Sequence, residues 1–137
     1  MRKRAPLAIG LLLAALAAGG CAPDADSDTA RTVTTRFLGA VGSGDGELAC
    51  AQLSPNARAQ LEKEEQRECR EAVTDLKVEP GSVTKVQVYA LNAIVDLSSG
   101  ESAFLEKGSQ GWRLDAVGCQ PQKGKPSDVP YDCQLQS

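Results

Sequence analysis

The sequence predicts an α+β domain in which helices come first and an antiparallel sheet follows. Two periodicities indicate this order. Before residue 79, apolar residues recur at steps of three and four, which is typical of amphipathic helices. After residue 85 they recur at every second position, which is typical of strands with one buried face. Helices followed by strands favour an α+β domain over a βαβ arrangement.

The first helix is expected to start near Asp28, because aspartate is a good helix N-cap. Its apolar face comprises Ala30, Val33, Phe37 and Val41. The stretch GSGDG at 42–46 is expected to end this helix. It lacks the Lys-Ser/Thr pair of a phosphate-binding loop, so we interpret it as a connection between helices.

Two more helices are expected before the strands. Asp45 can cap a short helix, GELACAQL, with Leu48 and Cys50 facing the core. Ser54 and Pro55 predict the start of a third helix, since serine caps helices and proline suits their first position. The charges between residues 62 and 71 alternate in sign, which is typical of a solvated helix face.

A turn at 79–81 separates the helices from the strands. Strands are expected over 85–90, 91–97, 102–107 and 112–117, as an antiparallel meander. The predicted core-facing residues of these strands include Val86, Val88, Val95, Leu97, Trp112, Leu114 and Ala116. The domain is expected to span 29–119, followed by an irregular tail at 120–137.

Four cysteines follow residue 21, and an even number in an exported domain predicts disulfides. Three pairings are open, and sequence order favours Cys50–Cys69 with Cys119–Cys133. The second pair would fasten the tail to the sheet. Zinc is the alternative ligand for four cysteines, but it needs close pairs, and the spacings here are 19, 50 and 14 residues.

The N-terminus has the layout of a secretory signal peptide. A basic start, Met1-Arg2-Lys3-Arg4, precedes an uncharged stretch rich in Leu and Ala and then two glycines. The apolar stretch is shorter than the roughly 18 residues of a membrane-spanning helix. Residues 1–20 are therefore predicted to be a signal peptide, and the polar stretch 21–28 a tether.

Cys21 stands at the end of this layout. The stretch Ala18-Gly19-Gly20-Cys21 resembles the bacterial lipobox. The resemblance implies that the Cys21 thiol takes a diacylglycerol and that cleavage before it makes Cys21 the new N-terminus. The protein would then be anchored to the outer face of the cytoplasmic membrane, outside the cytoplasm. An ordinary signal peptide, with Cys21 a spectator, is the alternative.

The charge of the mature chain limits its partners. The chain has 15 basic and 18 acidic residues, and three of the basic ones fall within residues 1–20. The remaining 12 basic and 18 acidic residues leave a net charge of −6. This balance argues against nucleic acid and against binding to an anionic membrane by charge alone. Membrane attachment is expected to come from the lipid at Cys21.

Three stretches span most of the mature chain: RFLGAVGSGDGELACAQLSPNARAQL at 36–61, AIVDLSSGESAFLEKGSQGWRLDAVGC at 93–119 and YDC at 131–133. In these stretches the chain resembles small exported lipoproteins of high-GC Gram-positive bacteria with a nuclear-transport-factor-2-like domain. The resemblance implies a cone of helices wrapped by a bent sheet, often with a pocket inside. This chain has fewer predicted strands than the usual member, which implies a truncated cone with a small or filled pocket.

Catalytic members of that superfamily use Asp, His, Tyr or Arg side chains inside the cone. This chain has no histidine, which excludes Ser-His-Asp and Cys-His sites. Asp96 with Tyr89 is the candidate acid–base pair, and Arg113 and Asp115 are the other polar strand residues. Alternation places both aspartates opposite the apolar face, so we expect them to be solvated and not catalytic.

Trp112 is interpreted as a core anchor rather than a ligand platform. The stretch DADSD at 24–28 lacks the Gly and terminal Glu of a calcium-binding EF-hand loop. No metal or cofactor is expected.

We therefore expect a non-enzymatic, lipid-anchored extracytoplasmic domain that binds a small apolar ligand or a cell-envelope protein. A small isomerase- or dehydratase-like enzyme and a structural accessory subunit are the alternatives. A deep pocket with a buried carboxylate would favour the enzyme, and a deep apolar pocket a ligand carrier. A filled core with an exposed apolar patch would favour a protein partner.

Overall fold

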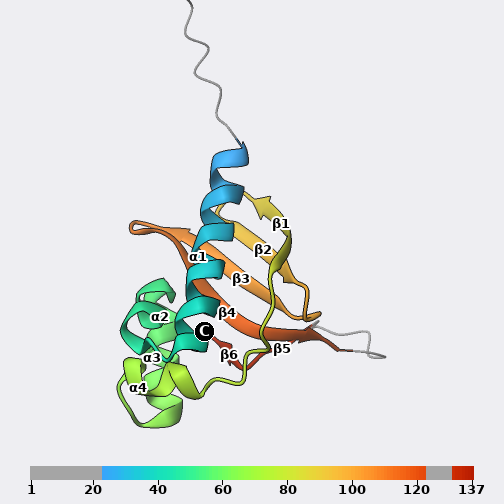
Figure 1. The fold of residues 1–137 in the computed structure, drawn as a ribbon. Coiled ribbons are helices and arrows are strands. Elements are labelled where there is room, and N and C mark those ends of the chain that lie inside the picture. Colours follow the sequence, from blue (N-terminus) through green and yellow to red (C-terminus); the bar gives the residue numbers. More distant parts are fainter. Residues whose placement is uncertain (1–22, 123–130) are drawn as a thin grey trace, which may run out of the picture.

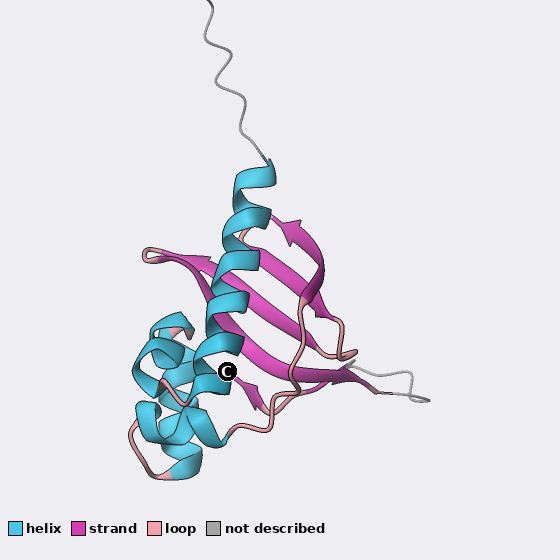
Figure 2. Cartoon of the chain, in the orientation of Figure 1, coloured by secondary structure: helices cyan, strands magenta, loops and turns pink. Residues whose placement is uncertain are grey.

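The computed structural model describes residues 23–122 and 131–137. It is an α+β domain in which helices pack on an antiparallel sheet, as the two periodicities predicted (Figure 1, Figure 2). The predicted signal peptide, 1–20, and the predicted lipid-attachment residue Cys21 lie outside the described residues.

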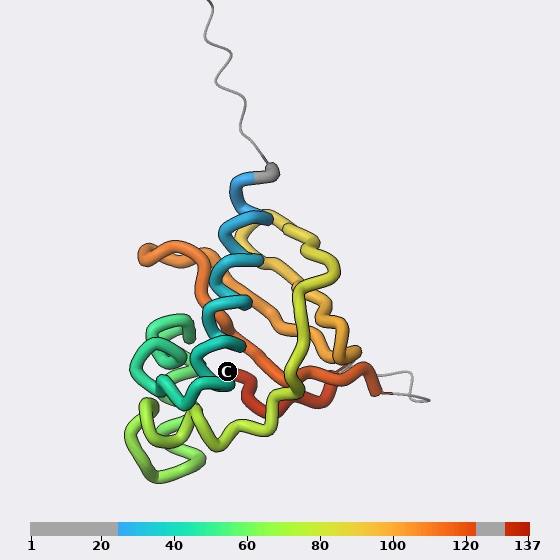
Figure 3. Tube along the Cα trace, viewed as in Figure 1, coloured from blue at the N-terminus to red at the C-terminus, as the bar shows by residue number. Residues whose placement is uncertain are grey.

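Helices occupy the first half of the described chain. They are α1 (Pro23–Ser43), α2 (Gly46–Gln52), α3 (Pro55–Glu65), α4 (Cys69–Ala72) and a 3₁₀ turn, η1 (Val73–Asp75). The long helix α1 crosses one face of the sheet, and the short helices gather beside its C-terminal half (Figure 1, Figure 3). The predicted caps are present, since Asp45 accepts from the N–H of Leu48 and Ser54 from that of Ala57.

The sheet is a meander with two short additions. Its strands are β1 (Val83–Tyr89), β2 (Asn92–Leu97), β3 (Ser102–Gly108), β4 (Gly111–Pro121), β5 (Tyr131–Asp132) and β6 (Leu135–Gln136). The strands β1 to β4 pair in chain order, and both β5 and β6 pair with β4. All these pairs are antiparallel, and the β3–β4 pair carries two irregularities in register that help to bend the sheet.

The predicted core faces are confirmed. Phe37 of α1, Val95 of β2 and Leu114 of β4 are each at most 1% exposed. Val86 and Val88 are only partly buried, because β1 is the edge strand. The prediction that Leu48 faces the core is wrong, because its side chain is 42% exposed. Its neighbours Ala49 and Cys50 in the short helix α2 are buried.

Both predicted disulfides are present. Cys50 bonds Cys69 and so joins α2 to α4, with the two Cα atoms 6.1 Å apart. Cys119 bonds Cys133 and so joins β4 to the segment between β5 and β6. A zinc site would need free thiolates, so this pairing leaves none of the four cysteines for a metal.

The first helix begins at Pro23, so the predicted start near Asp28 is wrong. The described part of the predicted tether, 23–28, is therefore helical. Proline is favourable at the first helical position, and an acidic residue near a helix N-terminus is stabilised by the helix dipole. Asp26 also accepts hydrogen bonds from Lys107 and Trp112, which hold this first turn against the sheet.

The structure extends the domain beyond the predicted boundary at residue 119; of the predicted irregular tail, residues 123–130 lie outside the described part of the chain. Strand β4 continues through Cys119 to Pro121, and the last residues of the chain form β5 and β6. Leu135 is 1% exposed and pairs with Val117, so the end of the chain belongs to the core. Gly118, with φ of 63°, lies directly against Gln134, an approach that a side chain would block.

Candidate functional site

The polar strand residues do not assemble into an acid–base pair. Tyr89 pairs with Asn92 at one end of the β1–β2 ladder, whereas Asp96 pairs with Lys85 near the other end. The Tyr89 hydroxyl accepts a hydrogen bond from the Gln87 amide instead, at 2.9 Å. The candidate pair of Asp96 and Tyr89 is therefore separated along the sheet.

The two aspartates are half-buried rather than fully solvated. Asp96 accepts a hydrogen bond of 2.8 Å from the Ser102 hydroxyl. Asp115 accepts one of 2.7 Å from the hydroxyl of Ser54, the buried residue that caps α3. Each carboxylate thus helps to hold neighbouring segments together. As alternation predicted, both lie on the face opposite their buried apolar neighbours.

The guanidinium of Arg113 donates a hydrogen bond of 2.8 Å to the backbone carbonyl of Trp112, the preceding residue of β4. Trp112 is 2% exposed, which confirms its role as a core residue.

The indole and the start of α1 meet in a polar contact that sequence patterns did not indicate. Trp112 Nε1 donates to Asp26 Oδ1 at 2.9 Å, and Lys107 Nζ lies 2.7 Å from the same oxygen. Lys107 Nζ is also 5.8 Å from the centroid of the Trp112 ring. The hydrogen bond from Lys107, followed by that from Trp112, lowers the pKa of Asp26 below its ordinary value of 3.8.

Glu101 is a buried carboxylate that the sequence did not single out. It is 3% exposed, and its Oε2 accepts from the backbone N–H of Glu79 at 3.1 Å. Its backbone carbonyl accepts from Leu97 at 2.9 Å. Glu101 therefore ties the segment that precedes β1 to the turn before β3, which is a structural role.

Charged residues between the end of α3 and η1 form ion pairs at the surface. Arg67 lies 2.8 Å from Asp75 and 3.4 Å from Glu65, and Arg70 lies 2.9 Å from Glu68. The hydrogen bond to Asp75 raises the pKa of Arg67. These side chains are exposed, as the alternating charges predicted. They do not lie on one continuous helix, because α3 ends at Glu65, Gln66 takes a φ of 53° and α4 begins only at Cys69.

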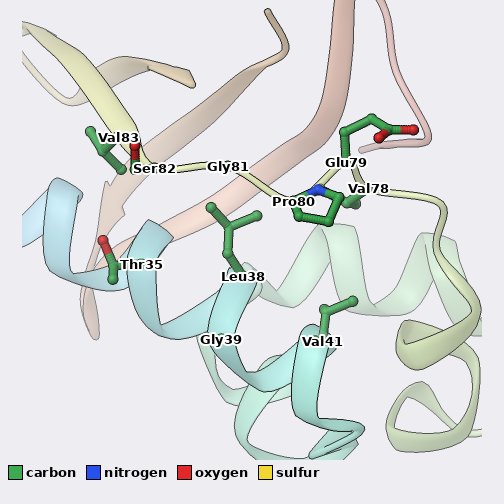
Figure 4. A pocket seen from close by; sticks show the side chains of 11 residues that line it. Thr35, Leu38, Gly39, Val41, Val78, Glu79, Pro80, Gly81, Ser82 and Val83 are labelled. Carbon is green, nitrogen blue, oxygen red and sulfur yellow. The ribbon is translucent and has the colours of Figure 1, made fainter. Parts of the chain in front are cut away.

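An apolar groove lies between α1 and the segment 78–83, which runs alongside this helix (Figure 4). Its volume is about 380 Å³. The apolar side chains that line it are Leu38, Val41, Val78, Pro80 and Val83, and the other lining residues are Thr35, Gly39, Gly42, Glu79, Gly81 and Ser82. We call these eleven residues the α1 groove.

Two glycines keep the α1 groove open. A Cβ added to Gly39 or to Gly42 would meet no atom within 4 Å, so the helix presents bare backbone there. Leu38, Val41 and Val83 are partly buried and pack against the core. The groove is therefore a recess in the surface of the domain, lined by side chains at the edge of the core. Neither Asp96, Asp115 nor Glu101 lines it. Periodicity could not reveal this site, because it depends on how a connecting segment lies beside a helix.

Residues 23–122 and 131–137 contain no group of three or more His, Cys, Asp or Glu placed to hold a metal ion. None of the helices in the described part of the chain has the length and apolar character needed to cross a membrane.

Comparison of the chain with models of known protein families, with curated proteins and with solved structures finds no match.

Proposed function

We propose that this protein is a lipid-anchored extracytoplasmic domain that binds a protein of the cell envelope through the α1 groove and catalyses no reaction. One observation carries the choice of a protein partner: the apolar recess lies at the surface, above a core that the domain's own side chains fill. Phe37, Leu105 and Trp112 are each at most 2% exposed in that core.

The location is supported by the sequence and by the disulfides. The basic start, the apolar stretch and Cys21 follow the order of a lipoprotein signal. Disulfides persist in oxidising compartments and are rare in the cytosol. The pairs Cys50–Cys69 and Cys119–Cys133 therefore suit a domain held outside the cytoplasm.

The shape of the α1 groove favours a protein partner over a small molecule. Small-molecule sites usually bury most of their ligand within a cavity. Here the groove is an open recess whose lining includes the exposed residues Thr35 and Gly42, so it does not enclose a small molecule on all sides. Apolar side chains projecting from a partner protein could instead pack on Leu38, Val41 and Val83 while the surrounding surfaces exclude water.

An enzymatic role has less support. The candidate carboxylates Asp96 and Asp115 accept hydrogen bonds from serines and lie outside the α1 groove. A catalytic carboxylate needs access to its substrate at hydrogen-bond range.

We further propose that the domain is a reduced nuclear-transport-factor-2-like cone. This relation is supported by the order of the elements, helices before a bent meander, and by the long helix α1 lying across one face of the sheet.

Site-specific cross-linking from the membrane-bound protein tests the partner. A photoreactive residue at the exposed Thr35, which lines the α1 groove, should trap one envelope protein, whereas the same residue at Glu64 on α3 should not. Gly42→Leu should abolish the cross-link, because it fills the groove without removing a native side chain. Gly108→Leu is the matched control, since it also adds a leucine in open space, outside the groove.

Two results would contradict the binding proposal. A cross-link that persists in Gly42→Leu would remove the α1 groove from recognition. A small molecule that copurifies with the wild type and is lost in Gly42→Leu, with no cross-linked protein, would replace the protein partner by a ligand. The anchor is tested separately: Cys21→Ser should release the protein from membranes, and a variant that stays bound and is cut at the same place would exclude lipidation.

A further inference from the structure

The turn between β1 and β2 exposes large apolar side chains. Among the described residues, three large apolar side chains are exposed, and two of them flank this turn. Tyr89 is 54% exposed and Leu91 is 61% exposed, with Ala90 between them. Exposed apolar side chains gathered at one point favour contact with a partner or a lipid surface.

This turn lies at the end of the molecule from which the N-terminal anchor would extend. The backbone N–H of Lys107 donates to the carbonyl of Leu91 at 2.8 Å, and Lys107 Nζ lies 2.7 Å from Asp26 Oδ1. Asp26 is in the first turn of α1, and Figure 1 shows the end of β1 beside the first turns of this helix. Cys21 precedes Pro23 by two residues in the sequence, so a lipid at Cys21 would join the chain next to the start of α1.

The chemistry of the turn suits the interface of a bilayer. Tyrosine is enriched at membrane interfaces because its ring is apolar and its hydroxyl is polar. The carbonyl of Leu91 already has a hydrogen-bond donor, which lowers the cost of moving it out of water. Asp26 and Lys107 pair with each other, so neither brings an unpaired charge to this end of the molecule.

We propose that the β1–β2 turn rests on the lipid bilayer, with Tyr89 and Leu91 in its interfacial region. This inference rests on the proposed lipid anchor at Cys21. It also orients the domain. Leu38 of the α1 groove lies fifteen residues along α1 from Pro23, which at about 1.5 Å per residue places it roughly 22 Å further from the anchored end. The groove therefore remains accessible to a partner while the turn is seated.

Fluorescence quenching by brominated lipids tests this contact directly. Tyr89→Trp and Leu91→Trp are made separately in the full chain, and each mature protein is purified from membranes. Each is reconstituted in vesicles of phosphatidylethanolamine and phosphatidylglycerol, with or without brominated acyl chains. Glu65→Trp on α3 is the control, because Figure 1 places α3 at the opposite end from the first turn of α1. The unsubstituted protein supplies the background from the buried Trp112.

We expect brominated lipid to quench the added tryptophan at 89 or at 91 and to leave the one at 65 unchanged. Mass spectrometry of the N-terminal peptide determines in the same samples whether Cys21 carries lipid. A lipidated protein in which neither turn tryptophan is quenched would overturn the membrane contact and leave the anchor intact. A Cys21 without lipid would overturn both. Equal quenching at 65 would also overturn the proposed orientation.

Discussion

Replacement of Gly46 by alanine tests the packing between α2 and α4. Gly46 is buried at the start of α2, and a Cβ built on it would lie 1.8 Å from the carbonyl oxygen of Arg70. Ordinary contact begins near 3.4 Å, so the two backbones would have to separate by more than an ångström. The neighbour of Arg70 is Cys69, which the disulfide to Cys50 holds to the same helix α2.

The expected loss is large for a single methyl group. Overpacking a core typically costs 1–3 kcal/mol, and here the obstacle is backbone that cannot rotate away, so we expect about 3 kcal/mol. For a domain of this size that corresponds to a fall of roughly 12 °C in Tm.

The assay is thermal and urea unfolding of the oxidised protein, followed by circular dichroism. Gly39→Ala is the matched control, because the added methyl group meets nothing within 4 Å and lies inside α1. It should stabilise the protein by about 0.5–1 kcal/mol, since glycine is unfavourable in a helix interior. The two substitutions add the same methyl group and should change stability in opposite directions.

The disulfide provides a further check. Replacing Cys50 and Cys69 by alanine frees α4 from α2, so Gly46→Ala should cost less in that background. A loss under about 1 kcal/mol in the oxidised protein would refute the argument from close backbone contact. An equal loss with and without the disulfide would show that the bond does not hold α4 in place.

Three further predictions concern other parts of the domain. Because the pKa of Asp26 is lowered in the folded state, its charge stabilises the protein above pH 3.8, and this stabilisation is lost as the pH falls through the folded-state pKa. Asp26→Asn should therefore lower stability at pH 7 by urea unfolding, and its difference from the wild type should shrink at low pH; a constant difference would contradict this. Replacing Cys119 and Cys133 by alanine opens a loop of 14 residues and should lower the free energy of unfolding, measured in urea, by about 3 kcal/mol. An unchanged free energy of unfolding would contradict this prediction. Ala90 has a φ of 53°, so Ala90→Gly should leave Tm unchanged or raise stability by up to about 1 kcal/mol, and a fall in Tm would count against strain there.

Features with a local repeat could be predicted from the sequence. The helical spacing of Ala30, Val33 and Phe37 and the alternation around Val95 and Leu114 each identify a buried face without knowledge of the partner. Single positions in short elements were less predictable. Leu48 is exposed because α2 has only seven residues and its buried side is taken by small side chains and a cysteine.

The start of α1 shows why the ends of a helix are harder to predict from sequence than its buried face. The acidic, small-residue composition of 24–28 is compatible with a solvated tether. Asp26 is helical in the fold because Trp112 and Lys107, more than eighty residues away, hold its carboxylate. No sequence pattern within the first thirty residues predicts these contacts with Lys107 and Trp112.

The sequence by itself determined the α+β class and the buried faces of α1 and the central strands, because periodicity is a property of neighbouring residues. It favoured one of three cysteine pairings, and the structure contains that pairing. Only the tertiary structure decided where α1 begins, how the last residues join β4, and that a groove opens between α1 and the segment 78–83. Each of these depends on contacts between segments distant in the chain. Such contacts form when the whole core closes, so their free energy is not encoded in any one stretch of sequence.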